Sequence, residues 1–361
     1  MKCFYTAYTN RNNVGDLLIT KYQIEEFAKY GEVYVDCKGM PEVFQKVIFD
    51  TSNTNIHDFV KDYGISYRSK QILKVFLIIN NHGFTLFSGS PGPREPLELP
   101  IRKLLLKLLG GILPSLFLNR RVKRIALGVD LNCNFSGLLG CLNKWYFNRF
   151  DIIGIRSHTN LKRLESQFKN VIYVPDMAFL YPGFEENSYE QKRKRIALSF
   201  RKVDNDSKVM DAVRSIDRAA KSYHLDIDFV YQVEEDRPFC KLIQSTLGSE
   251  NISFINEPID FYSLNSYQKY DMVISNRLHV LLMAAMNGAL PFGLISNSDN
   301  EQKIADIIKD VFGEDHISFL DSFSETNFEH LLSIMDTKRR NVKLCVDQQR
   351  MLCSNSIKVL Q

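Results

Sequence analysis

Residues 275–291 read SNRLHVLLMAAMNGALP, and this stretch decides how the rest of the chain is interpreted. The apolar, strand-like run Met272–Ile274 leads into it, and the apolar, helix-like run Val280–Met286 follows the charged residues. A glycine and a proline then precede another apolar run, Phe292–Ile295. This pattern predicts a strand, a turn, a helix and a second strand in an α/β sheet. In such sheets the turn after a strand faces the ligand crevice.

Arg277 and His279 occupy this predicted turn. The start of a helix offers free N–H groups and a positive dipole end, which suit an anion. One turn could therefore present a guanidinium, an imidazole and backbone donors to a phosphate or carboxylate. The alternative is structural: Arg277 belongs to an ion pair, and His279 is a core histidine with satisfied hydrogen bonds. The spacing alone leaves both interpretations open.

The rest of the chain alternates strand-like and helix-like runs, which is typical of parallel sheets covered by helices. The expected strands of the first half are residues 1–8, 32–37, 124–129, 152–155 and 171–174, with a helix at 17–30 and apolar runs at 75–79 and 84–88 around a turn. The expected elements of the second half are strands 195–200, 227–232 and 252–255 and helices 208–224 and 236–247. The polar stretch Glu185–Arg195 between the halves is the best linker candidate.

At 361 residues the chain exceeds what one hydrophobic core usually supports. We therefore expect an α/β protein with two Rossmann-like domains facing a central cleft. The N-terminal domain is predicted at 1–184 and the C-terminal domain at 185–335, followed by a helical tail at 336–361.

The amino-acid composition indicates which class of protein this is and in which cellular compartment it works. Lys plus Arg number 46 and Asp plus Glu 42, a small surplus that argues against a nucleic-acid binder. The seven cysteines are scattered and never form a CxxC pair, which fits a reducing cytoplasm better than a disulfide framework or a zinc site. The opening MKCFYTAYTNRNN has no apolar signal region. We expect a cytoplasmic protein.

Other candidate ligand-binding residues also follow expected strands. Arg156, Asp176 and Arg201 each come directly after an apolar run. The loops Asn13–Asp16 and Ser88–Arg94 contain glycines that let the backbone approach a ligand, and the second could form an anion-binding nest. Each feature alone also fits ordinary turn chemistry or a solvated charge. Their convergence on one cleft favours a site.

Metal and nucleophile signatures are missing from the sequence. It contains neither HExxH nor GxSxG. Asp204-Asn205-Asp206 fits a metal–diphosphate contact by its letters, but it also fits the cap of the helix that follows. We expect no metal.

The segment Ile101–Leu118, IRKLLLKLLGGILPSLFL, is the most hydrophobic of the chain. Its charges and its proline argue against a membrane-spanning helix. Leucines fill one side of a helical wheel, basic residues share the other, and four more basic residues follow up to Arg124. Such a helix can lie on an anionic membrane surface, or it can cover a sheet with its basic side in water.

Together these pieces resemble the polysaccharide pyruvyl transferase family over about residues 10–313. The resemblance rests on five motifs: NVGD (Asn13–Asp16), SGSPG (Ser88–Gly92), IGIRSHTNLKRL (Ile153–Leu164), VPDMAF (Val174–Phe179) and SNRLHVLLMAAMNGALP (Ser275–Pro291). Lys303 also stands where such proteins commonly carry a lysine. The sequence departs from the family pattern at two places. It has a shorter run of glycines at 88–92, and it has Ser157 where family members often have an acidic residue.

The resemblance implies a glycosyltransferase-B-type architecture, with the acceptor on the N-terminal domain and the donor on the C-terminal domain. It also implies transfer of pyruvate from phosphoenolpyruvate to a sugar, lipid-linked or nucleotide-linked, as a cyclic ketal. His279 would then be the general acid, and Arg277 and Arg156 would contact the donor's anionic groups from the two domains. The substrate-binding residues expected are Leu278, Asn13, Gly15, Asp16, Gly89, Ser90, Asp176, Arg201 and Lys303.

Under this interpretation phosphoenolpyruvate is the donor substrate, and no further cofactor is expected. A lipid-linked acceptor would suit reversible contact with the inner face of the plasma membrane. Two alternatives stay open: a nucleotide-sugar-dependent glycosyltransferase of the same fold, and an inert binding subunit of a polysaccharide assembly complex.

Overall fold

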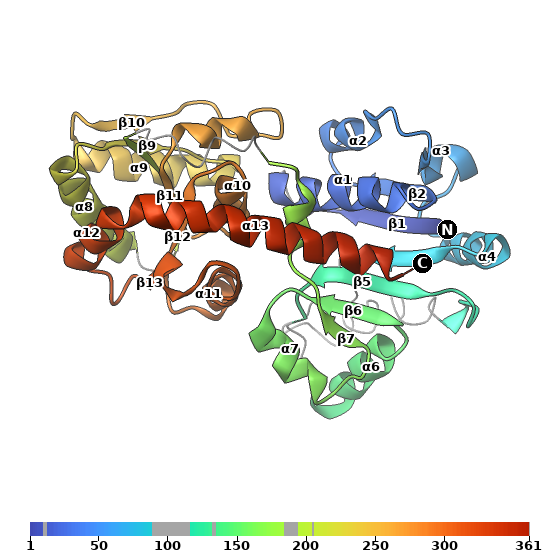
Figure 1. Ribbon diagram of the computed structural model, residues 1–361. Helices are drawn as coiled ribbons and strands as arrows, with labels where there is room; N and C mark the ends of the chain where they lie inside the picture. Colours follow the sequence, from blue (N-terminus) through green and yellow to red (C-terminus); the bar gives the residue numbers. More distant parts are fainter. Residues whose placement is uncertain (10–12, 89–115, 132–134, 184–193, 204–205, 361) are drawn as a thin grey trace. The chain divides into compact units, whose positions relative to one another are not determined.

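The computed structural model describes the chain except for residues 10–12, 89–115, 132–134, 184–193, 204–205 and 361 (Figure 1). Its contacts divide it into two compact units. Unit 1 consists of Met1–Asn12, Ile19–Leu180 and Leu352–Gln361, and unit 2 of Asn13–Leu18 and Tyr181–Met351. The boundary predicted between 184 and 185 lies outside the described residues and stays a prediction. The predicted C-terminal tail corresponds to a helix, α13 (Met335–Lys358), whose residues are shared between the units.

Unit 1 is built on a seven-stranded sheet with the order β3-β2-β1-β4-β5-β6-β7 (Figure 1). All its strand pairs are parallel. The strands are β1 (Lys2–Tyr8), β2 (Glu32–Gly39), β3 (Ile56–Asp58), β4 (Thr85–Ser88), β5 (Arg124–Val129), β6 (Ile152–Ile155) and β7 (Val171–Tyr173). The helices are α1 (Val14–Ala28), whose residues up to Leu18 group with unit 2, α2 (Glu42–Phe49), α3 (Phe59–Tyr63), α4 (Ile72–His82), α6 (Gly137–Phe147), α7 (His158–Glu165) and the short η1 (Met177–Leu180).

The apolar run at 75–79 belongs to helix α4, not to a strand. Val75, Phe76 and Ile79 are spaced for one helix face, and that face is buried. Gly83, with φ of 67°, ends the helix, and β4 begins two residues later. Strand β3, which the apolar pattern did not predict, lies at the edge of the sheet, and its three residues are only half-buried.

Unit 2 repeats this architecture with a six-stranded sheet, in the order β10-β9-β8-β11-β12-β13. Its strand pairs are parallel as well. The strands are β8 (Arg195–Ser199), β9 (Asp226–Phe229), β10 (Ile252–Phe254), β11 (Met272–Ser275), β12 (Leu290–Ile295) and β13 (Ile317–Phe319). The helices are α8 (Asp206–Ser222), η3 (Glu234–Asp236), α9 (Arg237–Leu247), η4 (Leu264–Lys269), α10 (Leu278–Met286), α11 (Asp299–Phe312), η5 (Glu314–His316), α12 (Glu325–Ser333) and α13.

The strand order of unit 2 indicates where a ligand is expected to bind. The order reverses between β8 and β11, since β9 and β10 lie beyond β8 while β12 and β13 lie beyond β11. In open α/β sheets, ligands bind outside the carboxyl ends of the strands at such a reversal. All four residues of β11 and all six of β12 are buried, as expected for central parallel strands. The predicted strand–turn–helix unit around Arg277 is thus confirmed, and it lies at the reversal.

A buried ion pair attaches α13 to unit 2. Arg339 Nη1 lies 2.7 Å from Asp271 Oδ1, and both side chains are at least 97% buried. Arg339 Nε and Nη2 also donate to the Gly288 carbonyl, at 3.2 and 3.1 Å. Gly288 has a φ of 85°, which favours glycine at this point just after α10. Gly288, the glycine predicted to end the strand–turn–helix motif, therefore turns the chain. Its carbonyl also accepts the hydrogen bonds of Arg339 from α13.

The predicted amphipathic segment is described only from residue 116 onward. Leucines 104, 105, 108 and 109 and the loop residues Gly89 and Ser90 lie outside the described residues. Leu118 is buried in the core of unit 1, whereas Leu116 and Phe117 are exposed. Within the described ranges, no helix combines the length and the apolar character needed to cross a bilayer.

Candidate active site

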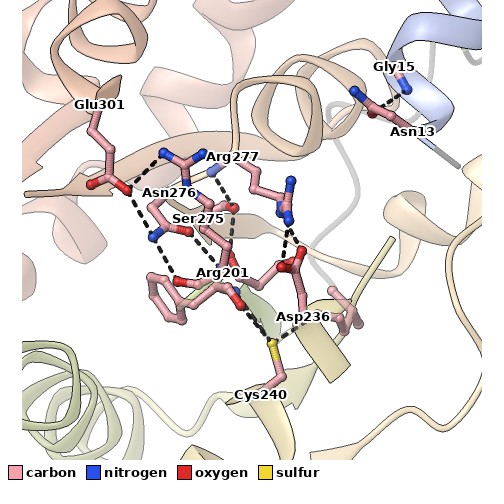
Figure 2. Close-up of polar contacts among 12 residues, drawn as sticks. Asn13, Gly15, Arg201, Asp236, Cys240, Ser275, Asn276, Arg277 and Glu301 are labelled. Atoms are coloured by element: carbon pink, nitrogen blue, oxygen red, sulfur yellow. Dashed lines mark hydrogen bonds and ion pairs between the residues drawn. The ribbon is translucent and has the colours of Figure 1, made fainter. Parts of the chain in front are cut away.

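Arg277 stands at the carboxyl end of β11, as the residue that precedes α10. Its guanidinium binds the Asp236 carboxylate through Nε and Nη2, and the Nη2–Oδ1 distance is 2.5 Å (Figure 2). The Asp236 side chain is 4% exposed and that of Arg277 is 21% exposed. The buried acid therefore fixes one edge of the guanidinium. No described residue hydrogen-bonds Nη1, so that side can receive an anion.

The environment of Asp236 sets its protonation behaviour. Burial raises the pKa of this carboxyl above its ordinary value, and the Arg277 guanidinium opposes the rise. Asp236 lies in η3, at the N-terminal side of α9 and beyond the end of strand β9. The two members of the pair thus follow β9 and β11, the strands on either side of β8.

Hydrogen bonds hold the backbone of the β11 turn. Ser275 Oγ donates to the Ser199 carbonyl of β8 at 2.6 Å, and it accepts from the Arg277 amide at 3.0 Å. The Arg277 side chain does not cap α10, so it leaves the first-turn amides of this helix to other acceptors. The turn is rigid, and it combines a helix N-terminus with a guanidinium.

Arg201 reaches the same region from β8, on the other side of the strand-order reversal. Its Nη2 lies 3.2 Å from Glu301 Oε1, and its amide donates to Asn276 Oδ1 at 2.9 Å (Figure 2). Glu301 is 1% exposed and also accepts from the Ser296 amide at 2.6 Å. The Arg201 side chain is 34% exposed. Unit 2 therefore carries two partly exposed arginines at its reversal, each anchored by a buried acid.

His279 is the second residue of α10 and is half-buried. It lies against the first turn of α1, whose residues 13–18 cluster with unit 2. A Cβ built on Gly15 would lie 2.1 Å from His279 Nδ1 and 2.2 Å from Cγ, far inside contact distance. Asn13 Oδ1 accepts from the Gly15 amide at 3.1 Å and shapes this turn (Figure 2). The missing side chain of Gly15 makes room for the imidazole.

Arg156 belongs to unit 1, where it follows β6. Its Nη1 lies 2.7 Å from Asp176 Oδ2, and Asp176 also accepts from the Ala178 amide at 3.0 Å. The Arg156 side chain is 15% exposed and that of Asp176 is fully buried. Ser157, which replaces the acid common in similar sequences, caps α7 by accepting from the Asn160 amide at 3.2 Å. Asp176 is therefore the acidic partner of Arg156.

The remaining predicted residues take different positions. Leu278 is buried, so only its backbone can meet a ligand, while Asp16 and Lys303 are half-buried on α1 and α11. Gly89 and Ser90 lie outside the described residues. Direct substrate contacts by these residues, and by Asn13, Gly15, Arg156, Asp176 and Arg201, stay predictions.

Cys240 lies beneath the arginines and is not a nucleophile. Its Sγ is 3.3 Å from the Phe200 carbonyl, and burial raises its pKa to about 12 (Figure 2). The thiol is therefore protonated at neutral pH. Among the residues with assigned positions, no group of three or more His, Cys, Asp or Glu side chains is placed to hold a metal ion.

The sequence analysis missed three residues that build this site: Asp236, Asn276 and Glu301. The sequence pattern identified Asp236 only as the first residue of a predicted helix, and Glu301 is distant in sequence from Arg201. A usable signal existed, because buried arginines need acidic partners and Asp236 follows a predicted strand. Choosing among the available acids requires the strand order, which the sequence does not state.

Comparison with known proteins agrees with these motifs. The family model described as "Polysaccharide pyruvyl transferase" matches residues 13–299. The chain belongs to the polysaccharide pyruvyl transferase family. The match begins at the NVGD turn and includes Arg156, Arg201 and the Arg277–His279 turn. No curated protein sequence matches this family member.

Two solved structures with a similar fold are described as UDP-GlcNAc 2-epimerases. The UDP-GlcNAc 2-epimerase of Neisseria meningitidis bound to UDP-GlcNAc has a TM-score of 0.57 at 11% identity, covering 100% of this chain and 98% of that one. The putative UDP-N-acetylglucosamine 2-epimerase of Listeria monocytogenes has a TM-score of 0.56 at 11% identity, with 98% and 91% covered. These low identities establish the fold alone, and they confirm the predicted glycosyltransferase-B-type architecture of two Rossmann-like units.

Proposed function

We propose that this family member transfers pyruvate from phosphoenolpyruvate to a sugar of a polysaccharide precursor, forming a cyclic ketal. The observation that carries the proposal is the anchored arginine pair of unit 2, Arg277 and Arg201, at the strand-order reversal. Phosphoenolpyruvate carries a phosphate and a carboxylate, so it requires at least two cationic contacts. Anchored guanidinium groups suit it because they are oriented before the donor arrives.

In this proposal Arg277 and the first-turn amides of α10, including that of Leu278, hold one anionic group of the donor. Arg201 and Lys303 contribute positive charge from β8 and α11. Arg156 is the contribution of unit 1 to donor binding, held in position by Asp176. The loop with Gly89 and Ser90 supplies further backbone contacts.

His279 is the proposed general acid. It donates a proton to C3 of phosphoenolpyruvate while a sugar hydroxyl attacks C2 and gives its proton to water, which reprotonates the imidazole, so that a tetrahedral phospho-ketal forms. A second hydroxyl of the sugar then attacks C2, and the bond from C2 to the phosphate oxygen breaks. The phosphate leaves as inorganic phosphate and takes up the proton of this hydroxyl as the ring closes. Imidazole suits the first step because its ordinary pKa lies near neutrality. The turn with Asn13, Gly15 and Asp16 lies beside this histidine.

The scheme needs no metal and no cofactor apart from the donor substrate. We place the reaction in the cytoplasm, on a saccharide that is lipid-linked or nucleotide-linked, with no role for nucleic acid. A second candidate is a glycosyltransferase that uses a nucleotide-sugar, since the similar fold of the Neisseria meningitidis epimerase is described with UDP-GlcNAc bound.

A thermal-shift panel separates these functions, because a ligand that binds only the native state raises the melting temperature. We expect phosphoenolpyruvate to stabilise the protein and UDP-GlcNAc to leave it unchanged. Arg277→Lys and Arg156→Lys should each reduce the shift, because a point charge cannot replace the planar fork. Arg214→Lys, at an exposed arginine of α8, is the matched control and should keep it.

Stabilisation by nucleotide-sugars alone would overturn the proposal in favour of the glycosyltransferase. Phosphoenolpyruvate binding without turnover in the presence of acceptor would identify an inert binding subunit.

A further inference from the structure

Unit 1 carries an exposed apolar patch, where α4 meets the segment 116–124. Leu73 and Leu77 of α4 are 49% and 58% exposed, and Leu116 and Phe117 are 48% and 59% exposed. Single exposed apolar residues are normal on protein surfaces, whereas several gathered in one place indicate a contact surface. We call these four residues the α4 patch.

Asn80 joins the two parts of the α4 patch. Its Nδ2 donates to the Phe117 carbonyl at 2.6 Å, and its Oδ1 accepts from the Asn119 amide at 2.8 Å. Asn80 follows Leu77 by three residues and Leu73 by seven, so the three lie on one face of the helix.

The backbone beneath the patch is fixed by the core. Leu118 and Val122 pack into the same buried cluster as Val75, Phe76 and Ile79 on the inner face of α4. The exposed leucines and Phe117 therefore project from a rigid base. Substituting them should leave the fold intact, because the packing residues are others.

Positive charge surrounds the patch. Besides Arg68, five exposed basic residues lie on or beside the two segments: Lys70, Lys74, Arg120, Arg121 and Lys123. Neither 68–82 nor 116–124 contains an acidic residue. None of the five forms an ion pair with a described residue, whereas exposed lysines elsewhere do, such as Lys221 with Asp217 at 2.9 Å. The combination is an apolar centre with a cationic rim that no acid among the residues with assigned positions pairs with.

We propose that the α4 patch docks unit 1 onto an anionic lipid bilayer. Apolar side chains enter the boundary between headgroups and acyl chains, and lysines and arginines beside them are attracted to anionic headgroups. Pairing of the patch with a second copy of itself would bring like charges together, which disfavours that occupant. The docking goes beyond the proposed reaction and does not depend on it.

Flotation of the full chain with lipid vesicles tests the docking. We expect binding to phosphatidylcholine vesicles that contain phosphatidylglycerol, no binding to pure phosphatidylcholine, and release by salt. Lys74→Glu with Arg121→Glu should lower partitioning by at least about 25-fold, at roughly fivefold for each cation removed. Leu77→Gln with Phe117→Ser should lower it as well.

The matched control is Lys241→Glu with Leu242→Gln on α9 of unit 2, where Leu242 is 54% exposed. These substitutions should leave flotation unchanged. Three results would overturn the docking: no binding to anionic vesicles, equal binding of both patch variants and the wild type, or loss of a dimer in the patch variants during sedimentation without lipid. Phosphoenolpyruvate binding is measured separately, so failure here leaves the proposed reaction standing.

Discussion

Gly15→Ala examines the contact between the first turn of α1 and His279. The added Cβ would lie 2.1 Å from Nδ1, 2.2 Å from Cγ and 2.6 Å from Cβ of the histidine, so the ring must move by more than 1 Å to reach ordinary contact. Overpacking of this kind costs about 1–3 kcal/mol. Alanine in a helix is otherwise favoured over glycine by about 1 kcal/mol. The single variant should therefore be neutral to about 2 kcal/mol less stable, and its turnover should fall more than its donor affinity.

A double-mutant cycle isolates the contact. With His279→Ala the ring is gone, so Gly15→Ala should then stabilise the protein by up to about 1 kcal/mol. The coupling between the positions should be about 1–3 kcal/mol. Proteins with two units unfold in more than one step, so the comparison uses the urea transition that His279→Ala itself shifts. Equal effects of Gly15→Ala in both backgrounds would refute the contact.

Three further predictions concern unit 2. Asp236→Asn should raise the KM for phosphoenolpyruvate about tenfold, with a smaller change in kcat, because Arg277 loses the carboxylate that orients it. A tenfold change corresponds to about 1.4 kcal/mol. An unchanged KM would contradict this prediction. Burial lowers the pKa of His316, so stability should fall as pH drops below about 6.5, and His316→Asn should flatten that dependence in thermal melts while leaving the fold unchanged. Arg339→Met should destabilise unit 2 by about 3–5 kcal/mol, because Asp271 is left buried and unpaired; a loss under 1 kcal/mol would count against the pair.

The sequence predicted the parts of the fold that have strong local patterns. The run from Met272 to Ile295 has apolar strands, an apolar helix and a glycine with positive φ, and each appears where the pattern placed it. Val75–Ile79 was ambiguous because a short apolar run fits a buried strand and a helix equally well. Strand β3 lies at the sheet edge and is only half-buried, so it carries little pattern.

The arginines of the candidate site and the acid Asp176 were predictable from the sequence, whereas the acids Asp236 and Glu301 were not. Arg277, Arg201 and Arg156 each follow a strand, and that position can be read from the chain. Asp236 and Glu301 reach their arginines across 41 and 100 residues of sequence, through the order of strands in the sheet. Sequence reasoning offered Arg277 as either a structural ion pair or a ligand contact. The structure shows the ion pair, which leaves Nη1 without a hydrogen bond to any described residue.

Transfer of the pyruvyl group is the central claim, and its most direct measurement follows the donor carbon. The protein is incubated with phosphoenolpyruvate labelled with carbon-13 at C2, together with glycan precursors from cells that lack the protein. We predict a carbon-13 signal at a ketal carbon of the glycan and one inorganic phosphate for each ketal formed, with both lost in His279→Ala. Label that remains in phosphoenolpyruvate with every precursor fraction, while a nucleotide-sugar is consumed, would contradict the account.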